Sequence, residues 1–175
     1  MAGRFHALRI VLLGLGAAVA YGILQDHVTA RIAPAYFNVA HADLGYPEIF
    51  HSQSPTVLAF AWGIVATWWV GLPLGLLMAV CARAGGWPKL GADDLLRPVG
   101  TLLVVLAVAA ATGGVLGWAL DLQHLAPAKV PVEQRAGWGI DWGIHLAAYL
   151  VGLVGGLVLC VSTLLRRRRL SRGTA

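Results

Sequence analysis

Residues 98–120 read PVGTLLVVLAVAAATGGVLGWAL, a run without a single charged side chain. A helix of this length extends across the hydrocarbon core of a bilayer, which is roughly 30 Å thick. Three more apolar runs of comparable length lie at about 7–25, 55–82 and 143–165. In lipid the backbone must satisfy its own hydrogen bonds, so each run is expected to be a helix. The sequence therefore predicts an all-α membrane protein, a four-transmembrane-helix bundle.

The composition supports this class. Of 175 residues, 58% are hydrophobic and 12% are charged, and the mean hydropathy is +0.74. A soluble domain carries about a quarter charged residues. The four spans and the outer loops 26–54 and 121–142 leave no room for a separate soluble domain, so we expect a single integral membrane domain over 1–175.

The positive charge of the chain has a membrane explanation. The net charge is +5, but four of the thirteen basic residues form the block Arg166–Arg169 beside the last apolar run. Such a cluster fits a membrane anchor in contact with lipid, and no nucleic-acid partner is expected. The cysteines Cys81 and Cys160 lie far apart and form no CxxC pair, which disfavours a disulfide-exchange enzyme.

Lysine and arginine predict the orientation of the helices. Ten of them flank the spans in the N-terminus, the middle loop and the C-terminus, namely Arg4, Arg9, Arg83, Lys89, Arg97, Arg166–Arg169 and Arg172. The other two loops hold only Arg31, Lys129 and Arg135. By the positive-inside rule, both termini are predicted to be cytoplasmic.

The first run has an alternative interpretation. Arg4 and Arg9, the apolar stretch 10–17 and the sequence Ala18-Val19-Ala20 are similar to the three zones of a cleavable signal peptide. Against cleavage, the apolar run continues through Leu24, and a fourth span is needed to keep both termini on one side.

Titratable residues are concentrated at the predicted outer face, which holds five of the six histidines and six of the eight acids. Three helix ends each offer an acid and a histidine: Asp26 with His27, Asp121 with His124, and Asp141 with His145. In a bundle, sites are built from facing helices in this way. Carboxylate and imidazole suit Zn²⁺, Fe²⁺ or Mn²⁺. We therefore hypothesise a divalent metal site formed by Asp26, His27, His41 and His145.

Small residues predict close helix packing. The pairs Gly71 and Gly75, Gly113 and Gly117, and Gly152 and Gly156 have the four-residue spacing that allows helix backbones to approach. Trp62 and Trp69 share one helix face, which is typical of packing residues and less often of a quinone or haem wall.

The stretch Tyr21-Gly22, Asp26, Thr29-Ala30-Arg31, Tyr36-Phe37 and His41 resembles a small, uncharacterised family of bacterial multi-span membrane proteins with a YGxxHDQxTxRxxxEYFxxxH-like motif. Trp62-Gly63, Ala66-Thr67-Trp68-Trp69, and His145 with Tyr149 are similar as well. The resemblance implies a multi-pass protein of the bacterial inner membrane, and it implies no activity. The chain departs from the motif in two places. His27 lies two residues after the position of the motif's histidine, which is about 200° further around a helix. Ala35 stands where the motif has an acid.

Three functional interpretations remain open. The first is a metal-dependent membrane protein whose metal activates water or binds a substrate from the lipid. The second is a structural or accessory subunit without a cofactor, whose polar rim contacts a partner membrane protein. The third is a haem protein ligated by His27 and His145. A transporter is disfavoured because ion pathways place ionisable groups inside the spans.

Overall fold

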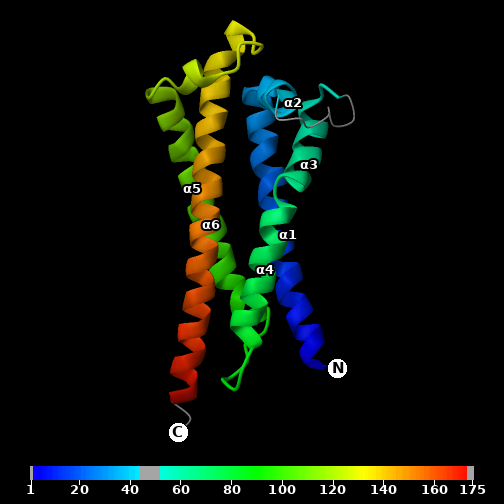
Figure 1. The fold of residues 1–175 in the computed structure, drawn as a ribbon, viewed down its shortest axis with the longest axis vertical. Helices are drawn as coiled ribbons and strands as arrows, with labels where there is room; N and C mark the ends of the chain where they lie inside the picture. Colours follow the sequence, from blue (N-terminus) through cyan, green and yellow to red (C-terminus); the bar gives the residue numbers. More distant parts are fainter. Residues whose placement is uncertain (1, 44–51, 173–175) are drawn as a thin grey trace.

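The structure is a computed structural model that describes residues 2–43 and 52–172, and within these ranges the chain is helical, without strands (Figure 1). The elements are α1 (Ala2–Ile32), η1 (Tyr36–Ala40), α2 (His41–Asp43), α3 (Pro55–Val65), α4 (Trp68–Arg83), α5 (Asp93–Ala119), η3 (Leu122–Leu125), η4 (Val132–Gln134) and α6 (Arg135–Arg172). Four helical segments are long and apolar enough to cross a membrane: Phe5–Ile32, Pro55–Arg83, Asp93–Ala119 and Val132–Arg172. The predicted all-α fold with four apolar spans is confirmed.

The helices extend further than the apolar runs. α1 continues through the polar stretch 25–31 and ends at Ile32, because Pro34 disfavours helix at the residue before it. α6 begins at Arg135, about two turns before its predicted start at 143. The segments predicted as outer loops are therefore partly helical. This difference matters for the site, since Asp26 and Asp141 lie within helices and not in loops.

The second span is interrupted, where the sequence predicts one long helix. α3 ends at Val65 and α4 begins at Trp68, with a turn at Ala66 and Thr67 between them. The freed carbonyl of Ala66 accepts a hydrogen bond from the Tyr149 hydroxyl of α6 at 3.0 Å. A non-helical backbone at membrane depth requires such a partner, because lipid offers none.

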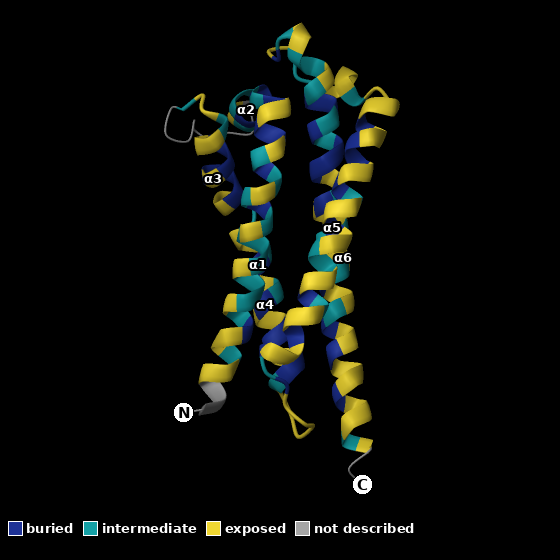
Figure 2. Ribbon diagram, turned by 180° about the vertical axis from the view of Figure 1, so that it is seen from behind, coloured by how far each residue is buried: buried dark blue, intermediate teal, exposed yellow. Residues whose placement is uncertain are grey.

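The helices form two pairs (Figures 1 and 2). α1 packs along α3 and α4, and α5 packs along α6, while α4 and α6 provide the largest contact between the pairs. Glycines let the backbones approach within each pair: Gly71 and Gly75 contact α1, and Gly113 and Gly117 contact α6. These two predicted glycine pairs are confirmed. In the third pair, Gly152 makes only ordinary contact with Leu106 of α5.

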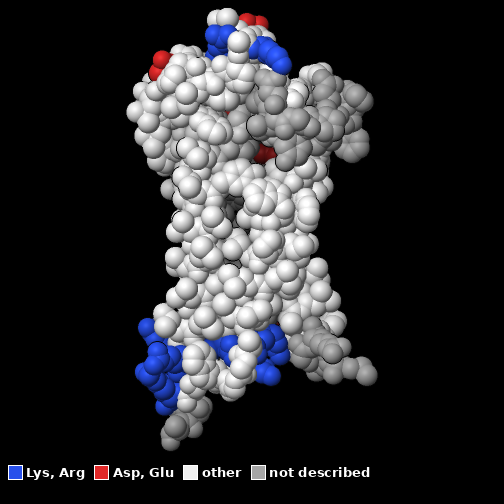
Figure 3. Space-filling model, in the orientation of Figure 1, with Lys and Arg blue, Asp and Glu red and all other residues white. Residues whose placement is uncertain are grey.

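Large apolar side chains are exposed on the outside of the bundle. Figure 2 colours exposed residues yellow, and they occur along all the long helices. On the face that Figure 3 shows, the surface between the two ends is almost free of charge. Both termini lie at one end, which we call the arginine-rich end and define by Arg9, Arg83 and Arg166–Arg169. The opposite end is called the histidine-rich end and carries Asp26, His41, Asp141 and His145. This apolar exterior is what a bilayer would cover.

Candidate functional site

The buried polar site at the histidine-rich end is centred on a contact between α1 and α6. The Nε2 atom of His145 lies 3.3 Å from Oδ1 of Asp26. Asp26 is 3% exposed and His145 is 8% exposed, so the pair is shielded from solvent. The two residues are separated by more than one hundred positions in the sequence, and the packing of the two helix pairs brings them together.

The hydrogen bonds of His145 determine how many protons the pair holds. Its Nδ1 atom lies 2.9 Å from the carbonyl oxygen of Asp141, and a carbonyl oxygen only accepts, so Nδ1 carries a hydrogen. A hydrogen bond between Nε2 and the Asp26 carboxyl then needs one further proton, on either the imidazole or the carboxyl. The Asp26–His145 pair therefore holds one exchangeable proton and carries no net charge in that state.

Asp141 is the second carboxyl of the site. Its side chain is 0% exposed, and neither carboxyl oxygen has a hydrogen-bond partner in the described part of the chain. Asp141 lies one helical turn before His145 on α6. Among the described residues, the side-chain oxygen of Gln25 and the indole Nε1 of Trp138 are also buried without a hydrogen-bond partner. Buried polar groups are rarely left in this state, and unsatisfied acceptors are a reason to look for a ligand.

Aromatic rings enclose the pair. The Tyr36 ring stacks on the His145 imidazole with centroids 4.6 Å apart, and the Phe37 ring meets the same imidazole edge-on at 5.9 Å. The Trp138 ring lies 6.0 Å from Tyr36. Tyr36 and Phe37 belong to the helical turn η1, which follows α1 directly and folds back over the end of the bundle.

His41 joins this enclosure from the start of α2. Its ring lies 3.9 Å from the Trp62 ring and 5.5 Å from the Tyr36 ring, and its Nδ1 lies 3.0 Å from the Tyr36 carbonyl oxygen. Burial lowers the pKa of His41, although the hydrogen bond to the Tyr36 carbonyl opposes this shift. Burial also raises the pKa of the Tyr36 hydroxyl, and the negative charge of Asp141 adds to the effect. Both side chains are therefore neutral at pH 7.

The structure brings Asp26, His145 and His41 to one cluster, but His27 lies elsewhere. The His27 ring packs edge-on against Phe60 of α3 at 5.1 Å, and its Nδ1 lies 2.9 Å from the Ile23 carbonyl oxygen. Asp121 and His124 are exposed and hydrogen bond locally, in the segment after α5. Over residues 2–43 and 52–172, no three His, Cys, Asp or Glu side chains come together as a metal site.

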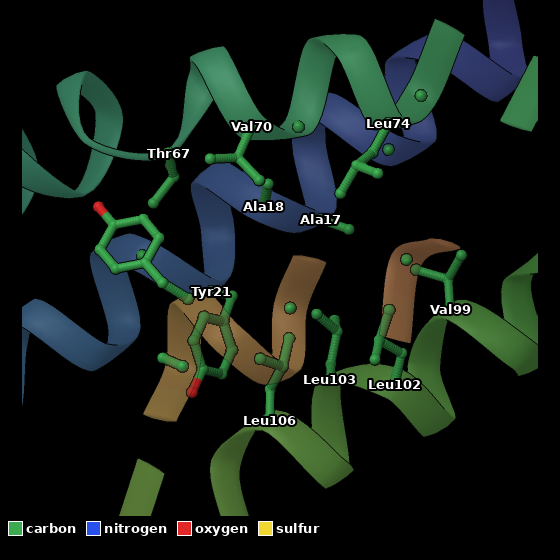
Figure 4. A pocket seen from close by; sticks show the side chains of 18 of the residues that line it. Ala17, Ala18, Tyr21, Thr67, Val70, Leu74, Val99, Leu102, Leu103 and Leu106 are labelled. Atoms are coloured by element: carbon green, nitrogen blue, oxygen red, sulfur yellow. The ribbon is translucent and has the colours of Figure 1, made fainter. Parts of the chain in front are cut away.

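A cavity lies directly beneath the Asp26–His145 pair, between the two helix pairs. It has a volume of about 140 Å³. Apolar side chains from α4 and α5, including Val70, Leu74, Leu102 and Leu106, face each other across it (Figure 4). Its polar lining is grouped toward the histidine-rich end and comprises Tyr21, Gln25, Asp26, Thr67, His145 and Tyr149.

The cavity has access from the side of the bundle. Figure 3 shows small openings between the two halves of the molecule at mid-height. The same view shows an acidic side chain in a recess nearer to the histidine-rich end. These openings lie in the uncharged band that a bilayer would surround.

Two features of this site do not follow from the sequence: the burial of Asp141 and the aromatic enclosure. The sequence pairs Asp141 with His145 at a helix end, but it does not indicate that Asp141 is fully buried. The enclosure by Tyr36 and Phe37 depends on η1 folding back, for which the sequence offers no clear signal. The available signal for Asp141 was spacing, because Trp138, Asp141 and His145 recur at three and four residues and so share one face of α6.

The fold and the site define a class: a multi-pass, all-helical protein with four apolar spans and a buried polar site above an apolar cavity. Comparison with protein-family models, with curated proteins and with solved structures finds no match to this chain. The resemblance to the uncharacterised bacterial membrane family therefore stays a prediction.

Proposed function

We propose that this membrane protein binds a single-chain amphiphile, with the apolar chain in the cavity between the helix pairs and the polar group at Asp26 and His145. The observation that supports the proposal is the polarity of the cavity. Four helices line it with small and aliphatic side chains, and only its end toward the histidine-rich end is polar.

The size and the lining of the cavity favour an apolar chain over water. A cavity needs a volume of roughly 10–15 Å³ to hold a single water, and waters in a cavity need polar partners. The cavity is about ten times larger, and the part between α4 and α5 is lined by Val70, Leu74, Leu102 and Leu106, which offer no side-chain partners. Ligand sites between the helices of a bundle commonly combine such an apolar lining with a few polar groups.

The interruption at Ala66 and Thr67 is consistent with this function. Discontinuous helices in membrane proteins accompany binding sites, because the broken turn leaves backbone groups facing a cavity. Here both residues line the cavity, next to Tyr149. Ionisable groups buried within spanning helices, such as Asp26 and His145, are also typical of functional sites.

The test uses a photoactivatable twelve-carbon alcohol and the purified full chain in phosphatidylcholine nanodiscs. Gly152 lines the cavity, and a Cβ added there makes only one ordinary contact, at 3.5 Å from Leu106. Gly152→Leu is therefore expected to fill the cavity and reduce labelling by about tenfold. Gly100→Leu is the matched control, since Gly100 is exposed on α5 with nothing within 4 Å.

Labelled residues are mapped by mass spectrometry, and helix content is checked by circular dichroism. Labelling that stays equal in wild type and in Gly152→Leu, or that maps only to the outer surface, contradicts the proposal. That result favours the structural or accessory subunit, which would be sought through a co-purified partner membrane protein.

Metal binding stays a prediction beside this proposal. Asp26 and His145 lie together and offer two metal ligands. His41 and His27 are the other residues that the sequence suggests for Zn²⁺, Fe²⁺ or Mn²⁺. Metal analysis of the purified protein, with His145→Ala for comparison, tests it. A stoichiometric metal that is lost in the variant supports the hypothesis, and a metal-free wild-type protein contradicts it. The haem hypothesis loses its proposed ligand pair, because His27 packs against Phe60 while His145 contacts Asp26.

A further inference from the structure

The cavity is elongated along the bundle. Each of the four helices that line it contributes residues at spacings of three and four, which lie on one continuous helix face. On α1 this face runs from Gly14 to Asp26, and on α6 it runs from His145 to Cys160. At a rise of about 1.5 Å per residue, the two stretches are about 18 Å and about 22 Å long. The buried pair of Asp26 and His145 lies at one end of both stretches.

The other end of the cavity is closed by packed side chains. Met78 of α4, Val99 of α5 and Cys160 of α6 line this end and are buried. We call these three residues the closed end. They belong to one core cluster, which continues beyond the cavity to Ile10 of α1. In Figure 4, Val99 lies at one end of the row of labelled side chains and Thr67 lies at the other. A chain that starts at the buried pair therefore has to stop at the closed end.

The length of the cavity limits the alkyl chain that it can hold. With carbon–carbon bonds of about 1.5 Å and tetrahedral angles, an extended alkyl chain advances by about 1.3 Å per carbon. The stretch from Gly14 to Asp26 is the shorter wall, and its length of about 18 Å corresponds to about 14 carbons. A longer chain would overlap the closed end or leave its polar group away from the buried pair. Overlap in a close-packed interior is unfavourable.

We infer that the site selects its amphiphile by chain length: it accepts an unbranched chain of up to about 14 carbons and excludes longer chains. This inference rests on the proposed function and specifies the class of ligand. Met78, Val99 and Cys160 set the limit, because they form the closed end. Glycines of the lining, such as Gly152, keep the path to the closed end open, since a large side chain there would project into it.

The test measures how straight-chain alcohols compete with the photoactivatable twelve-carbon alcohol for the purified full chain in phosphatidylcholine nanodiscs. The series comprises octanol, decanol, dodecanol, tetradecanol, hexadecanol and octadecanol. Each alcohol is compared at the same mole fraction in the membrane, so that differences in partitioning do not enter. Tetradecanol is expected to compete best. Octadecanol is expected to compete at least about tenfold worse, because even one methylene too many in a closed apolar pocket costs roughly tenfold or more in affinity.

Two variants enlarge the cavity at its closed end. Met78→Ala removes most of a long side chain and is expected to move the optimum from tetradecanol to hexadecanol. Val99→Ala removes less and is expected to move the optimum in the same direction. Leu76→Ala is the matched control, because Leu76 lies on α4 but is exposed on the outside of the bundle. Thermal unfolding without competitor shows whether each variant is folded, and Val99→Ala decides the result if Met78→Ala does not fold.

Gly152→Leu shortens the cavity. Gly152 lies seven residues after His145, which is about 10 Å along α6. The variant is expected to keep its labelling by a photoactivatable eight-carbon alcohol, although it loses most of its labelling by the twelve-carbon alcohol. Gly100→Leu, which faces open space on α5, is expected to be labelled by both alcohols as the wild-type protein is.

The outcomes separate the two proposals. If competition keeps increasing up to octadecanol in the wild-type protein, or does not depend on chain length, the limit is wrong and the amphiphile site stands. The same conclusion follows if both closed-end variants leave the optimum at tetradecanol, or if Leu76→Ala moves it as far. A shift to longer chains at the closed end, with Leu76→Ala unchanged, supports the inference. If no alcohol displaces the photolabel, both proposals fail.

Discussion

At the scale of the single residue, Arg167 shows how burial changes the interpretation of a charge. In the sequence it is one of four consecutive arginines that suggest a lipid anchor. In the structure it is 0% exposed and donates hydrogen bonds to the carbonyls of Cys81, Ala84, Trp87 and Pro88 at 2.6–3.2 Å. The last carbonyls of a helix lack partners within the helix, and Arg167 satisfies that of Cys81 in the last turn of α4, together with three carbonyls of the segment that follows α4.

Arg167→Gln is therefore expected to destabilise the protein, and Arg168→Gln is expected to have little effect because Arg168 is exposed. Removal of a charged donor from several buried carbonyls costs roughly 2–4 kcal/mol. Thermal unfolding of both variants in the same detergent measures the difference. Equal melting temperatures would contradict the structural role assigned to Arg167.

At the scale of the element, glycines determine how closely the two helices of each pair approach. A Cβ added at Gly143 of α6 would overlap the carbonyl oxygen of Gly113 on α5, and the same holds for Gly117 against Gly139. These contacts are between backbones, so neither side can move aside by a change of rotamer. The α5–α6 pair is therefore held at a distance that only glycine allows.

Gly143→Ala is expected to destabilise the protein by roughly 1–3 kcal/mol, because the helices must separate to admit the methyl group. Gly100→Ala on α5 faces open space and is expected to be neutral or slightly stabilising, since alanine favours helix more than glycine does. Chemical unfolding in mixed micelles compares the two. A Gly143→Ala protein as stable as wild type would show that the crossing is looser than described.

At the scale of the whole molecule, the two ends differ in charge and chemistry. Arg9, Arg83 and the arginines of α6 lie at the end that carries both termini, and the buried acids and histidines lie at the other end. The positive-inside rule predicts that the arginine-rich end faces the cytoplasm. The site would then lie near the outer face of the membrane.

Reporter fusions in a bacterial host test this orientation. Alkaline phosphatase, which is active only outside the cytoplasm, is expected to be inactive when fused after Arg172 and active when inserted after Ala128. A green fluorescent protein fused after Arg172 is expected to fluoresce. Phosphatase activity at the C-terminus would reverse the orientation, and the mass of the mature chain shows whether the segment before Ala20 is retained.

The amino-acid sequence alone determines the number of spans and their helical state, because lipid imposes length and apolarity locally. An even number of spans also places the two termini at the same end of the molecule. The sequence also predicts the close packing at Gly71 and Gly113. The metal hypothesis named Asp26 and His145 among its residues, and the structure does place these two together.

Only the tertiary structure decides which side chains meet. Asp26 and His27 are adjacent, but successive residues of a helix point about 100° apart, so one faces α6 and the other faces α3. The rotation of α1 about its axis is set by the contacts of Gly14 and Gly22 with the neighbouring helices, not by local pattern. The break at Ala66, the cavity beside it and the burial of Asp141 likewise depend on how the two pairs pack, which no single span encodes.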